Sequence, residues 1–377
     1  MRRRTAPLAA ALAALAALIA LPAQASEDNG TDRYIVVLKD AVDPDAVSKL
    51  HTKKYGANVD KVWGHALRGY AAAIAKDRVA EVRSDPNVAY VETDGDASIE
   101  VQTVPWGIDK IEADLSSTRA GDGTGTVSNV SVFVIDTGVQ RTHPDLNVVN
   151  FVNFRGGKND DCNGHGTHVA GTIAARDDTQ GVVGVIPGAP VYAVKVLNCH
   201  GSGSWSSVIS GIDWVTANHG PNAVANMSLG GGANQAVDDA VRRSAASGVF
   251  YALSAGNSSA DACGQSPARA GTTSGIATVA ATDSSDREAS FSNYGSCVDI
   301  WAPGVSVFST YRGSSYATLS GTSMASPHVA GGGGLYLSTH PGGSPASVEG
   351  ALKAAAVTTG TRSKDNRAIT REYVRNF

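Results

Sequence analysis

The chain is poor in cysteine, aromatic residues and charge. Four of its 377 residues are cysteine, aromatic residues make up 6%, charged residues make up 18%, and the formal net charge is -4. Because there is no basic stripe and no RNA-binding signature, we expect no nucleic-acid partner. The sequence has no internal repeat, and its 42 glycines argue against a coiled coil or a helical repeat. These absences leave a loop-rich globular protein, long enough for one large domain and one small one.

Long hydrophobic runs are absent beyond the N-terminus. There, Arg2-Arg3-Arg4 supplies a positive region, residues 8–21 an apolar core, and Ala23-Gln24-Ala25 an A-x-A cleavage site. The alternative, a membrane anchor, is weaker because the apolar core is too short to span a bilayer and is broken by Pro22. We expect residues 1–25 to be a signal peptide, the protein to be secreted, and no membrane association after cleavage.

The few cysteines become informative in an exported chain, where four of them suggest two disulfides. Three connectivities are possible from the sequence alone. Pairing nearest neighbours along the chain gives Cys162–Cys199 and Cys263–Cys297. Each bond would close a loop and contribute about 3–4 kcal/mol on the chain-entropy model.

A first folding unit is expected between residues 34 and 95. The patterns predict strands at 34–38 and 88–91, an extended region at 62–74, and helices at 44–55 and 77–83. The order β-α-β-β-α-β predicts a small α+β, ferredoxin-like sheet with two helices on one face. Acidic and turn-rich residues follow, so we expect a cleavable junction there.

From residue 106 onward, strands alternate with helices, which indicates a parallel α/β sheet. Near-continuous apolar runs fit strands that are covered on both faces. Ligands bind at the carboxyl ends of such strands, so Asp136 and Asn257, which follow two of them, should share one rim. The expected strands are 130–135, 191–196, 223–227, 249–254 and 276–280, and the expected helices are 165–175, 206–218, 235–247, 323–337 and 346–356.

Three segments contain the parts of a nucleophilic site. Asp136 ends an apolar strand, His165 opens a glycine-flanked helix, and Ser323 lies at or near a helix start, beside N–H groups that would stabilise an oxyanion. A serine becomes nucleophilic when a base takes its proton and a carboxylate orients that base. The order Asp, His, Ser is one of the known orders of hydrolytic triads, the one found in subtilisin.

These motifs resemble those of the subtilisin-like serine proteases, in the branch of proteinase K and aqualysin. The resemblance covers about residue 106 to beyond 336, and residues 34–95 resemble the family's inhibitory propeptide. It implies a three-layer α/β domain with a mainly parallel central sheet at 98–377, preceded by a propeptide at 26–97. The matching segments are DTG at 136–138, HGTHVAG at 165–171 and GTSMASPH at 321–328, supported by 105–107, 225–232 and 290–299.

The resemblance assigns roles residue by residue. It makes Asp136 the orienting carboxylate, His165 the general base and Ser323 the nucleophile. His168 matches a position that is not catalytic. Asn257 matches the side chain of the oxyanion hole, where it acts with the backbone N–H of Ser323.

A substrate is then expected to lie extended between two backbone segments, Gly201-Ser202-Gly203 and Ser228-Leu229-Gly230. Trp205 and Val208 match residues that line an apolar pocket upstream of the scissile bond in the family. The alternative for both is ordinary helix packing, which explains Val208 equally well. We expect a broad preference for apolar or aromatic side chains. The primary pocket would be lined by Leu229, Gly230, Ala255 and Gly256.

Calcium is the cofactor that the resemblance implies, in a structural role, and we expect no organic cofactor. Asp299 matches a calcium-binding aspartate of the proteinase K branch, with carbonyl ligands from near Ser274 and Ile276. The loop at 270–274 departs from that branch because it replaces a proline-containing segment.

The helix after Ser323 also departs from the family. Gly331-Gly332-Gly333-Gly334 stands where relatives usually carry Val and Ala after the first glycine. Each extra glycine inside a helix costs about 1 kcal/mol relative to alanine. We expect a weakened helix, unless close packing requires the missing side chains. We also expect Pro327 to lie within the first helical turn.

We therefore predict a secreted, monomeric serine endopeptidase that acts on proteins or peptides and cuts its own junction within about Asp94–Gln102. Its propeptide would serve as intramolecular inhibitor and folding aid. One alternative is a zinc-stabilised binding protein using Cys162, His165 and His168, with Cys199 and His200 downstream. Another is a catalytically silent binding protein on the same fold. An α/β-hydrolase esterase does not fit, because Ser323 lacks the G-x-S-x-G context.

Overall fold

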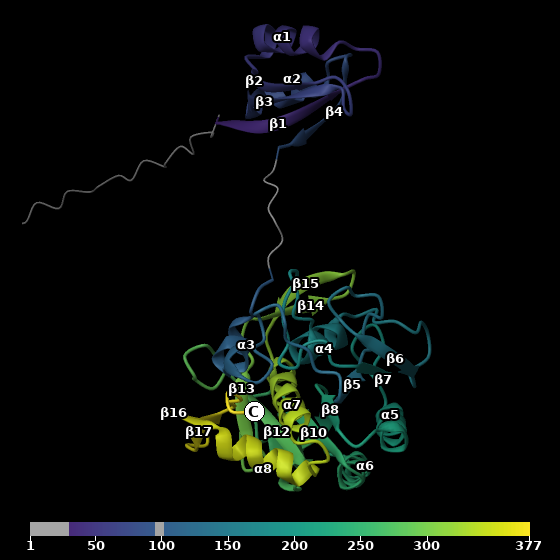
Figure 1. Cartoon of the computed structure of the whole chain (residues 1–377), viewed down its shortest axis with the longest axis vertical. Helices are drawn as coiled ribbons and strands as arrows, with labels where there is room; N and C mark the ends of the chain where they lie inside the picture. The colour runs from purple at the N-terminus through teal and green to yellow at the C-terminus, as the bar shows by residue number, and fades with distance from the viewer. Residues whose placement is uncertain (1–29, 95–101) are drawn as a thin grey trace, which may run out of the picture. The chain divides into compact units, whose positions relative to one another are not determined.

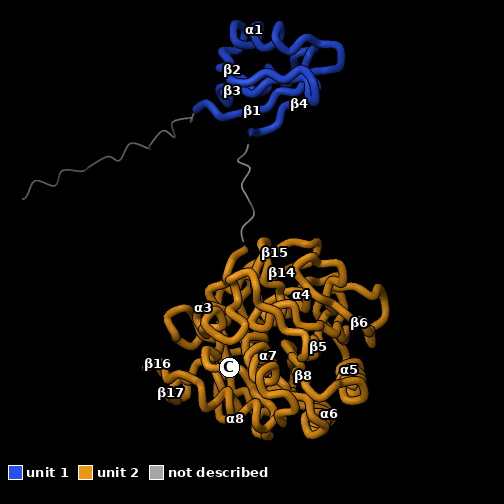
Figure 2. Tube along the Cα trace, in the orientation of Figure 1, with its two compact units in different colours: residues 1–98 blue, residues 99–377 orange. Residues whose placement is uncertain are grey.

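A computed structural model describes residues 30–94 and 102–377. The chain divides into two compact units, one up to residue 98 and one from residue 99 (Figure 2). The expected signal peptide and most of the expected junction lie outside the described residues. Within the described residues, no helix is both long and apolar enough to cross a bilayer.

The first unit is a four-stranded antiparallel sheet with strand order β2-β3-β1-β4 and two helices on one face (Figure 1). Helix α1 starts where the Asp43 carboxylate accepts a hydrogen bond from the N–H of Asp45, and it ends at Gly56, whose φ is 69°. This confirms the predicted β-α-β-β-α-β order. The elements are β1 (Thr31–Leu38), α1 (Pro44–Tyr55), β2 (Asn58–Trp63), β3 (Gly69–Ala75), α2 (Val79–Arg83) and β4 (Val88–Thr93).

The second unit is built on a nine-stranded sheet with strand order β16-β17-β13-β12-β10-β8-β5-β7-β6. All neighbouring pairs are parallel except the β16–β17 pair at one edge. The strands are β5 (Ser131–Asp136), β6 (Val148–Asn153), β7 (Val191–Lys195), β8 (Ala223–Met227), β10 (Val249–Ser254), β12 (Ile276–Thr282), β13 (Ile300–Pro303), β16 (Val357–Arg362) and β17 (Ala368–Arg371).

Helices cover both faces of this sheet, which confirms the three-layer α/β prediction (Figure 1). Helices α4, α7 and α8 pack on one face, and α5 and α6 on the other, so the two faces have separate apolar cores. The central strands are apolar and buried on both sides, as their sequences predicted. The helices are α3 (Trp106–Lys110), α4 (His165–Ala174), α5 (Trp205–Asn218), α6 (Gln235–Ala246), α7 (Thr322–Thr339) and α8 (Pro345–Ala355).

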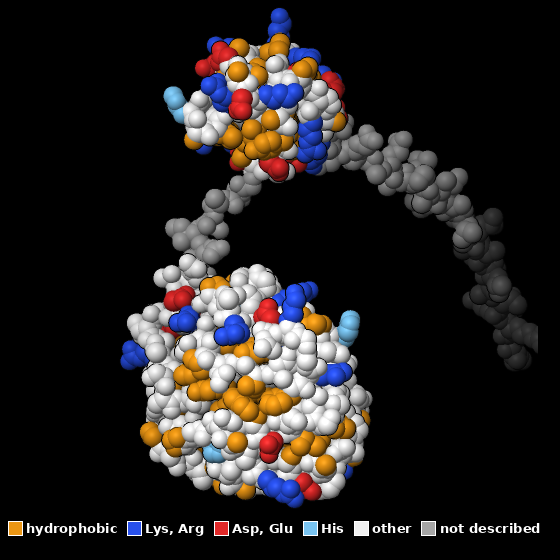
Figure 3. All heavy atoms as spheres, turned by 90° about the vertical axis from the view of Figure 1, so that its right-hand side faces the viewer, with side chains coloured by type: hydrophobic (Ala, Val, Ile, Leu, Met, Phe, Trp, Pro, Cys, Tyr) orange, Lys and Arg blue, Asp and Glu red, His pale blue; other side chains and the backbone are white. Residues whose placement is uncertain are grey.

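Apolar side chains gather on the face that carries β6 and α5 (Figure 3). Figure 3 looks onto this side and shows hydrophobic side chains gathered over the middle of the second unit. Tyr192, Ile209 and Trp214 are partly buried apolar residues that pack on the core beneath α5 and α6.

Helix α7 is central to the unit and is continuous through the glycine run. All four glycines are buried, and a Cβ added at Gly333 or Gly334 would lie 2.6 Å from Phe250 or Ile186. Neighbouring side chains thus fill the space where side chains of the helix would otherwise lie, so close packing requires glycine at these positions. The expectation for Pro327 was wrong: it lies inside the helix, beyond the first turn.

Two disulfides stabilise loops of the second unit. Cys162 bonds to Cys199 and Cys263 bonds to Cys297, which is the nearest-neighbour pairing. The structure has no free cysteine in the residues that it describes. The zinc-site alternative is therefore wrong, because both of its thiolate ligands are consumed in a disulfide.

Candidate active site

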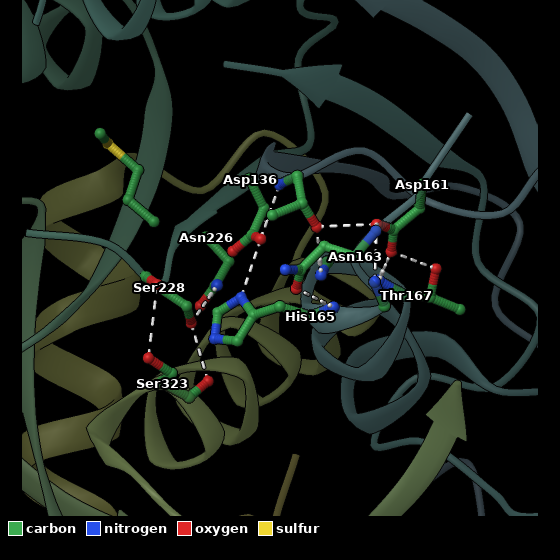
Figure 4. Close-up of polar contacts among 12 residues, drawn as sticks. Asp136, Asp161, Asn163, His165, Thr167, Asn226, Ser228 and Ser323 are labelled. Carbon is green, nitrogen blue, oxygen red and sulfur yellow. Dashed lines mark hydrogen bonds and ion pairs between the residues drawn. The ribbon is translucent and has the colours of Figure 1, made fainter. Parts of the chain in front are cut away.

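Three elements bring Asp136, His165 and Ser323 to one end of the central sheet. Asp136 is the last residue of β5, His165 is the first residue of α4, and Ser323 lies in the first turn of α7. Gly164 precedes His165 with a φ of 105°, a backbone conformation that a residue with a Cβ rarely adopts. In Figure 4 the imidazole of His165 lies between Asp136 on one side and Ser323 on the other.

The carboxylate of Asp136 holds the imidazole of His165. Nδ1 of His165 lies 2.8 Å from Oδ1 of Asp136, and the N–H of Thr137 donates to the same oxygen at 2.7 Å. Asp136 is fully buried, whereas the side chain of His165 is 26% exposed. Burial opposes protonation of His165, but the charge and hydrogen bond of Asp136 and the charge of Asp161 outweigh it and raise its pKa. The site therefore holds a histidine that is basic and reachable from solvent.

Asp161 is a second buried carboxylate beneath this pair. It accepts hydrogen bonds from the N–H and Oγ1 of Thr167 at 2.9 and 2.6 Å, and from Oγ1 of Thr137 at 2.9 Å. The N–H of Gly164 also donates to it, at 2.8 Å. These contacts tie the loop after β5 to the start of α4 (Figure 4). Sequence reasoning missed Asp161, although its place directly before Cys162 and the histidine motif was a signal.

Ser323 faces a polar segment of chain. Its Oγ donates to the carbonyl of Ser228 at 3.3 Å, and its own carbonyl accepts from Oγ of Ser228 at 2.8 Å. Ser323 thus lies against the segment expected to bind substrate backbone, with its hydroxyl directed to the carbonyl of Ser228 (Figure 4).

Asn257 follows β10 and reaches the same turn. Its Oδ1 accepts from the N–H of Thr322 at 2.8 Å and from Oγ1 of Thr322 at 2.9 Å. Oγ1 of Thr322 also accepts from the N–H of Gly256 at 3.1 Å. Because Thr322 uses the oxygen of the Asn257 amide, its Nδ2 is the end that remains for a ligand. Thr322 is a further residue of the site that sequence reasoning missed.

A cleft of about 470 Å³ opens beside His165. Most of the residues expected to bind substrate line it, but Ala255 and Gly256 do not. Val208 lines the cleft and is also buried in the core under α5, so both of its expected roles are compatible with its place. The lining includes Gly201, Ser202, Gly203, Trp205, Ser228, Leu229 and Gly230.

His168 occupies a different environment from His165. It is buried, and its Nε2 lies 3.1 Å from the carbonyls of Val307 and Ala317, on β14 (Val307–Tyr311) and β15 (Ser315–Leu319). Burial lowers its pKa to about 4. His168 is therefore a neutral side chain that donates to backbone carbonyls, and it has a structural role rather than that of a catalytic base.

The surroundings of Asp299 do not fit a calcium ion. Its Oδ1 lies 2.9 Å from Nζ of Lys353, and its Oδ2 accepts from the N–H of Thr278 at 2.9 Å. The same ammonium contacts Glu349 at 3.1 Å. A positive side chain therefore already stands against the carboxylates that would have to hold the metal, which argues against the expected calcium site at Asp299.

A different corner fits a hard cation better. Asp145 is 3% exposed, and its Oδ1 has no hydrogen-bond partner among the described residues. Burial raises its pKa to about 7, and the charge of Asp178 adds to this. The N–H of Val182 donates to Oδ2, while the amide nitrogen of Gln102 contacts the carbonyls of Val182 and Arg176 at 3.3 and 2.8 Å. The two carbonyls accept from Gln102, whereas the buried Oδ1 of Asp145 is unpaired among the described residues, and a carboxylate oxygen is a ligand that calcium prefers.

Comparison of the sequence with known protein families assigns the chain to one of them. Residues 127–373 match the Subtilase family, and residues 33–99 match the peptidase inhibitor I9 family. The chain therefore belongs to the subtilase family of serine proteases. It is a secreted serine protease with an N-terminal propeptide of the I9 type, and its fold is the subtilisin-like fold.

Individual relatives support this assignment. The chain is 47% identical over 309 residues to the "Extracellular serine proteinase" of Thermus sp. (strain Rt41A), covering 79% of this chain and 73% of that protein. It is 43% identical over 335 residues to "Alkaline serine exoprotease A" of Vibrio alginolyticus, covering 84% of this chain but 60% of that longer protein. A cold-adapted subtilisin-like serine proteinase of solved structure matches at a TM-score of 0.62 and 41% identity, over 74% of this chain and 98% of that one. The expected proteinase K and aqualysin branch stays a prediction.

Proposed function

We propose that Asp136, His165 and Ser323 form the catalytic triad of a broad-specificity endopeptidase that matures itself. The observation that supports this most strongly is the 2.8 Å contact between Asp136 and Nδ1 of His165, with Ser323 beside the ring. That contact leaves Nε2 of the imidazole as the nitrogen that can take a proton from Ser323.

In the proposed reaction, Oγ of Ser323 attacks the carbonyl carbon of a peptide while His165 accepts its proton. Asp136 stabilises the resulting imidazolium. The backbone N–H of Ser323 and Nδ2 of Asn257 donate to the oxyanion. His165 then protonates the leaving amine, and water hydrolyses the acyl-enzyme with His165 again as base.

A peptide would lie extended along the cleft, between the backbones of Gly201–Gly203 and Ser228–Gly230. Trp205 and Leu229 supply apolar lining, which supports a preference for apolar or aromatic side chains. One protein chain contains the whole of this cleft, so we propose that a monomer is active.

The junction between the two units is the proposed site of self-cleavage. On its first side, the N–H of Asp94 donates to the carbonyl of Arg33 within the first unit at 3.0 Å. On its second side, the N–H of Thr103 donates to the carbonyl of Gly181 at 2.8 Å within the second unit. Between these anchors we propose a cut within about Asp94–Gln102. The proposed divisions of the chain are a signal peptide at 1–25, a propeptide at 26–97 and a peptidase domain at 98–377.

We also propose a structural calcium ion at the Asp145 corner. Asp145, with the carbonyls of Arg176 and Val182 and the side chain of Gln102, would hold it. When bound, the ion would neutralise the buried carboxylate and fasten the N-terminal segment of the second unit. It takes no part in the reaction.

Labelling with a serine-directed phosphonate, followed by peptide mapping, tests the nucleophile, and we expect the label on Ser323. A Ser323→Ala chain tests self-processing, because it should keep its propeptide joined to the peptidase domain. Recovery of the same mature N-terminus from that variant would show that another protease makes the cut. A label on a different serine would overturn the triad.

A further inference from the structure

Pro327 changes the hydrogen bonding of the turn that carries Ser323. In an α-helix, the carbonyl of one residue accepts from the N–H four residues later. Four residues after Ser323 the helix has Pro327, which has no N–H. The carbonyl of Ser323 therefore lacks its helical donor, at the residue whose hydroxyl is the proposed nucleophile.

Ser228 supplies the missing donor from outside the helix. Its Oγ donates to the carbonyl of Ser323 at 2.8 Å, and its own carbonyl accepts from Oγ of Ser323 at 3.3 Å. The two serines are thus joined by two hydrogen bonds that run in opposite directions (Figure 4). A hydroxyl has one proton, so this arrangement holds only while Ser228 gives its proton to Ser323 and to no other group.

Asn226 faces the Ser228 hydroxyl with a group that can only donate. Nδ2 of Asn226 lies 2.9 Å from Oγ of Ser228, and Oδ1 of Asn226 accepts from Oγ of Ser326 at 2.7 Å. Asn226 and Ser326 are fully buried, and Ser228 is 4% exposed. Water therefore does not compete for these bonds. Among the described residues, the amide of Asn226 leaves the Ser228 proton one protein acceptor, the carbonyl of Ser323.

We propose that Asn226 is a positioning residue for the peptidase reaction: through Ser228 it orients the helical turn that Pro327 leaves without a donor. The inference rests on the proposal that Ser323 is the nucleophile. Ser228 also begins the segment proposed to bind substrate backbone, so the same contacts set the distance between that segment and the nucleophile. Asn226 itself touches neither substrate nor reacting atoms.

The variant Asn226→Asp tests the direction of the hydrogen bonds, because it keeps the shape of the side chain and removes its donor. The carboxylate would draw the Ser228 proton to itself and leave the Ser323 carbonyl unpaired. We expect kcat to fall by about tenfold to a hundredfold, the range produced when a reacting group is displaced. KM should change much less, since the substrate-binding backbone is intact. Rates are divided by the concentration of phosphonate-titrated sites, which removes the effect of misfolded protein.

Two further variants separate positioning from general stability. Ser228→Ala removes the donor to Ser323 directly and should lower kcat to a similar extent, while Ser326→Ala removes the other contact of Asn226 and should lower kcat less. In the Ser228→Ala background, Asn226→Asp should add little further loss of kcat, since both changes break one link. Full kcat in Ser228→Ala, or independent losses in the double variant, would overturn the inference even if Asn226→Asp failed to fold. Phosphonate labelling of a serine other than Ser323 would instead refute the proposed nucleophile.

Discussion

Nζ of Lys353 lies 2.9 Å from Oδ1 of Asp299, so a side chain of the protein supplies the positive charge at a corner where the family resemblance implies calcium. Burial raises the pKa of Asp299 to about 6, although the hydrogen bonds from Thr278 and Lys353 and the charge of Lys353 lower it. The charged form of this carboxylate therefore depends on these partners. Lys353 also contacts Glu349, and the pair of acids would be left without a cation if it were removed.

We therefore expect Lys353→Met to lower the stability of the protein and to create a dependence on calcium at this corner. The loss without calcium should be about 1 kcal/mol, because the ammonium is 45% exposed and solvent screens it. Thermal unfolding of phosphonate-inhibited enzyme, in EDTA and in excess calcium, measures the effect. An unchanged calcium increment in Lys353→Met would show that Lys353 does not substitute for a metal.

At the Asp145 corner we expect the wild-type protein itself to depend on calcium. Removing calcium from the wild-type protein should lower its Tm, because the buried Oδ1 of Asp145 would lose its charge partner. Asp145→Asn should bind one calcium ion fewer and lose most of this dependence. Calcium stoichiometry by equilibrium dialysis, together with Tm, measures both. Equal calcium binding by wild type and Asp145→Asn would place the ion elsewhere.

The activity should depend on pH through His165. Its pKa is raised, so kcat/KM should increase with pH as the imidazole loses its proton, with a midpoint above the ordinary value of about 6.5. Asp161→Asn removes a charge that favours the protonated form, and the midpoint should move to lower pH. Profiles of kcat/KM for wild type and Asp161→Asn measure the shift. A midpoint that moves upward would contradict this electrostatic account.

Glu372 should make the folded protein less stable as the pH rises. It is fully buried in the core beside Gly332, neither of its oxygens has a hydrogen-bond partner among the described residues, and burial raises its pKa to about 8. The neighbouring cation Arg371, whose charge opposes this shift, is paired with Asp286. Because the folded pKa lies above the unfolded one, the protonated acid favours folding fully below about pH 4.5, and this is lost progressively up to about pH 8.

Glu372→Gln removes this titration and keeps the volume of the side chain. We expect the variant to gain stability over wild type as the pH rises from about 5 to 8, by up to a few kcal/mol. Unfolding midpoints of phosphonate-inhibited enzyme at several pH values measure the difference. If the two proteins change in parallel between pH 5 and 8, Glu372 does not titrate in this range.

Much of this fold was readable from the sequence because its central strands and helices carry strong local signals. The strands ending near Asp136 and Ser254 are continuous apolar runs, and both were predicted within one residue at each end. The strands β6 and β13 to β17 were not predicted. They lie near the sheet's edges or in small separate sheets, where short or partly polar segments are held by their neighbours rather than by local preference.

The parts of the site that escaped prediction depend on long-range contacts. Lys353 meets Asp299 across 54 positions of sequence, and Ser326 meets Asn226 across 100. Pro327 was misplaced because its local cost suggested a helix start, whereas Ser228, 95 positions from Ser323, compensates for the missing donor. Motifs predict which residues take part in the reaction. Which other residues contact them depends on the packing of the folded chain.

The Cys162–Cys199 bond has a consequence for where the enzyme can complete its cleft. Cys162 lies just before His165, and Cys199 just before the Gly201–Gly203 segment, so one covalent bond fastens both walls beside the base. Thiols stay reduced in the cytosol and are oxidised only after export. A chain still in the cytosol of the producing cell would lack this disulfide. The more stable form of the protease would therefore arise only after export, away from the proteins of the cell that made it.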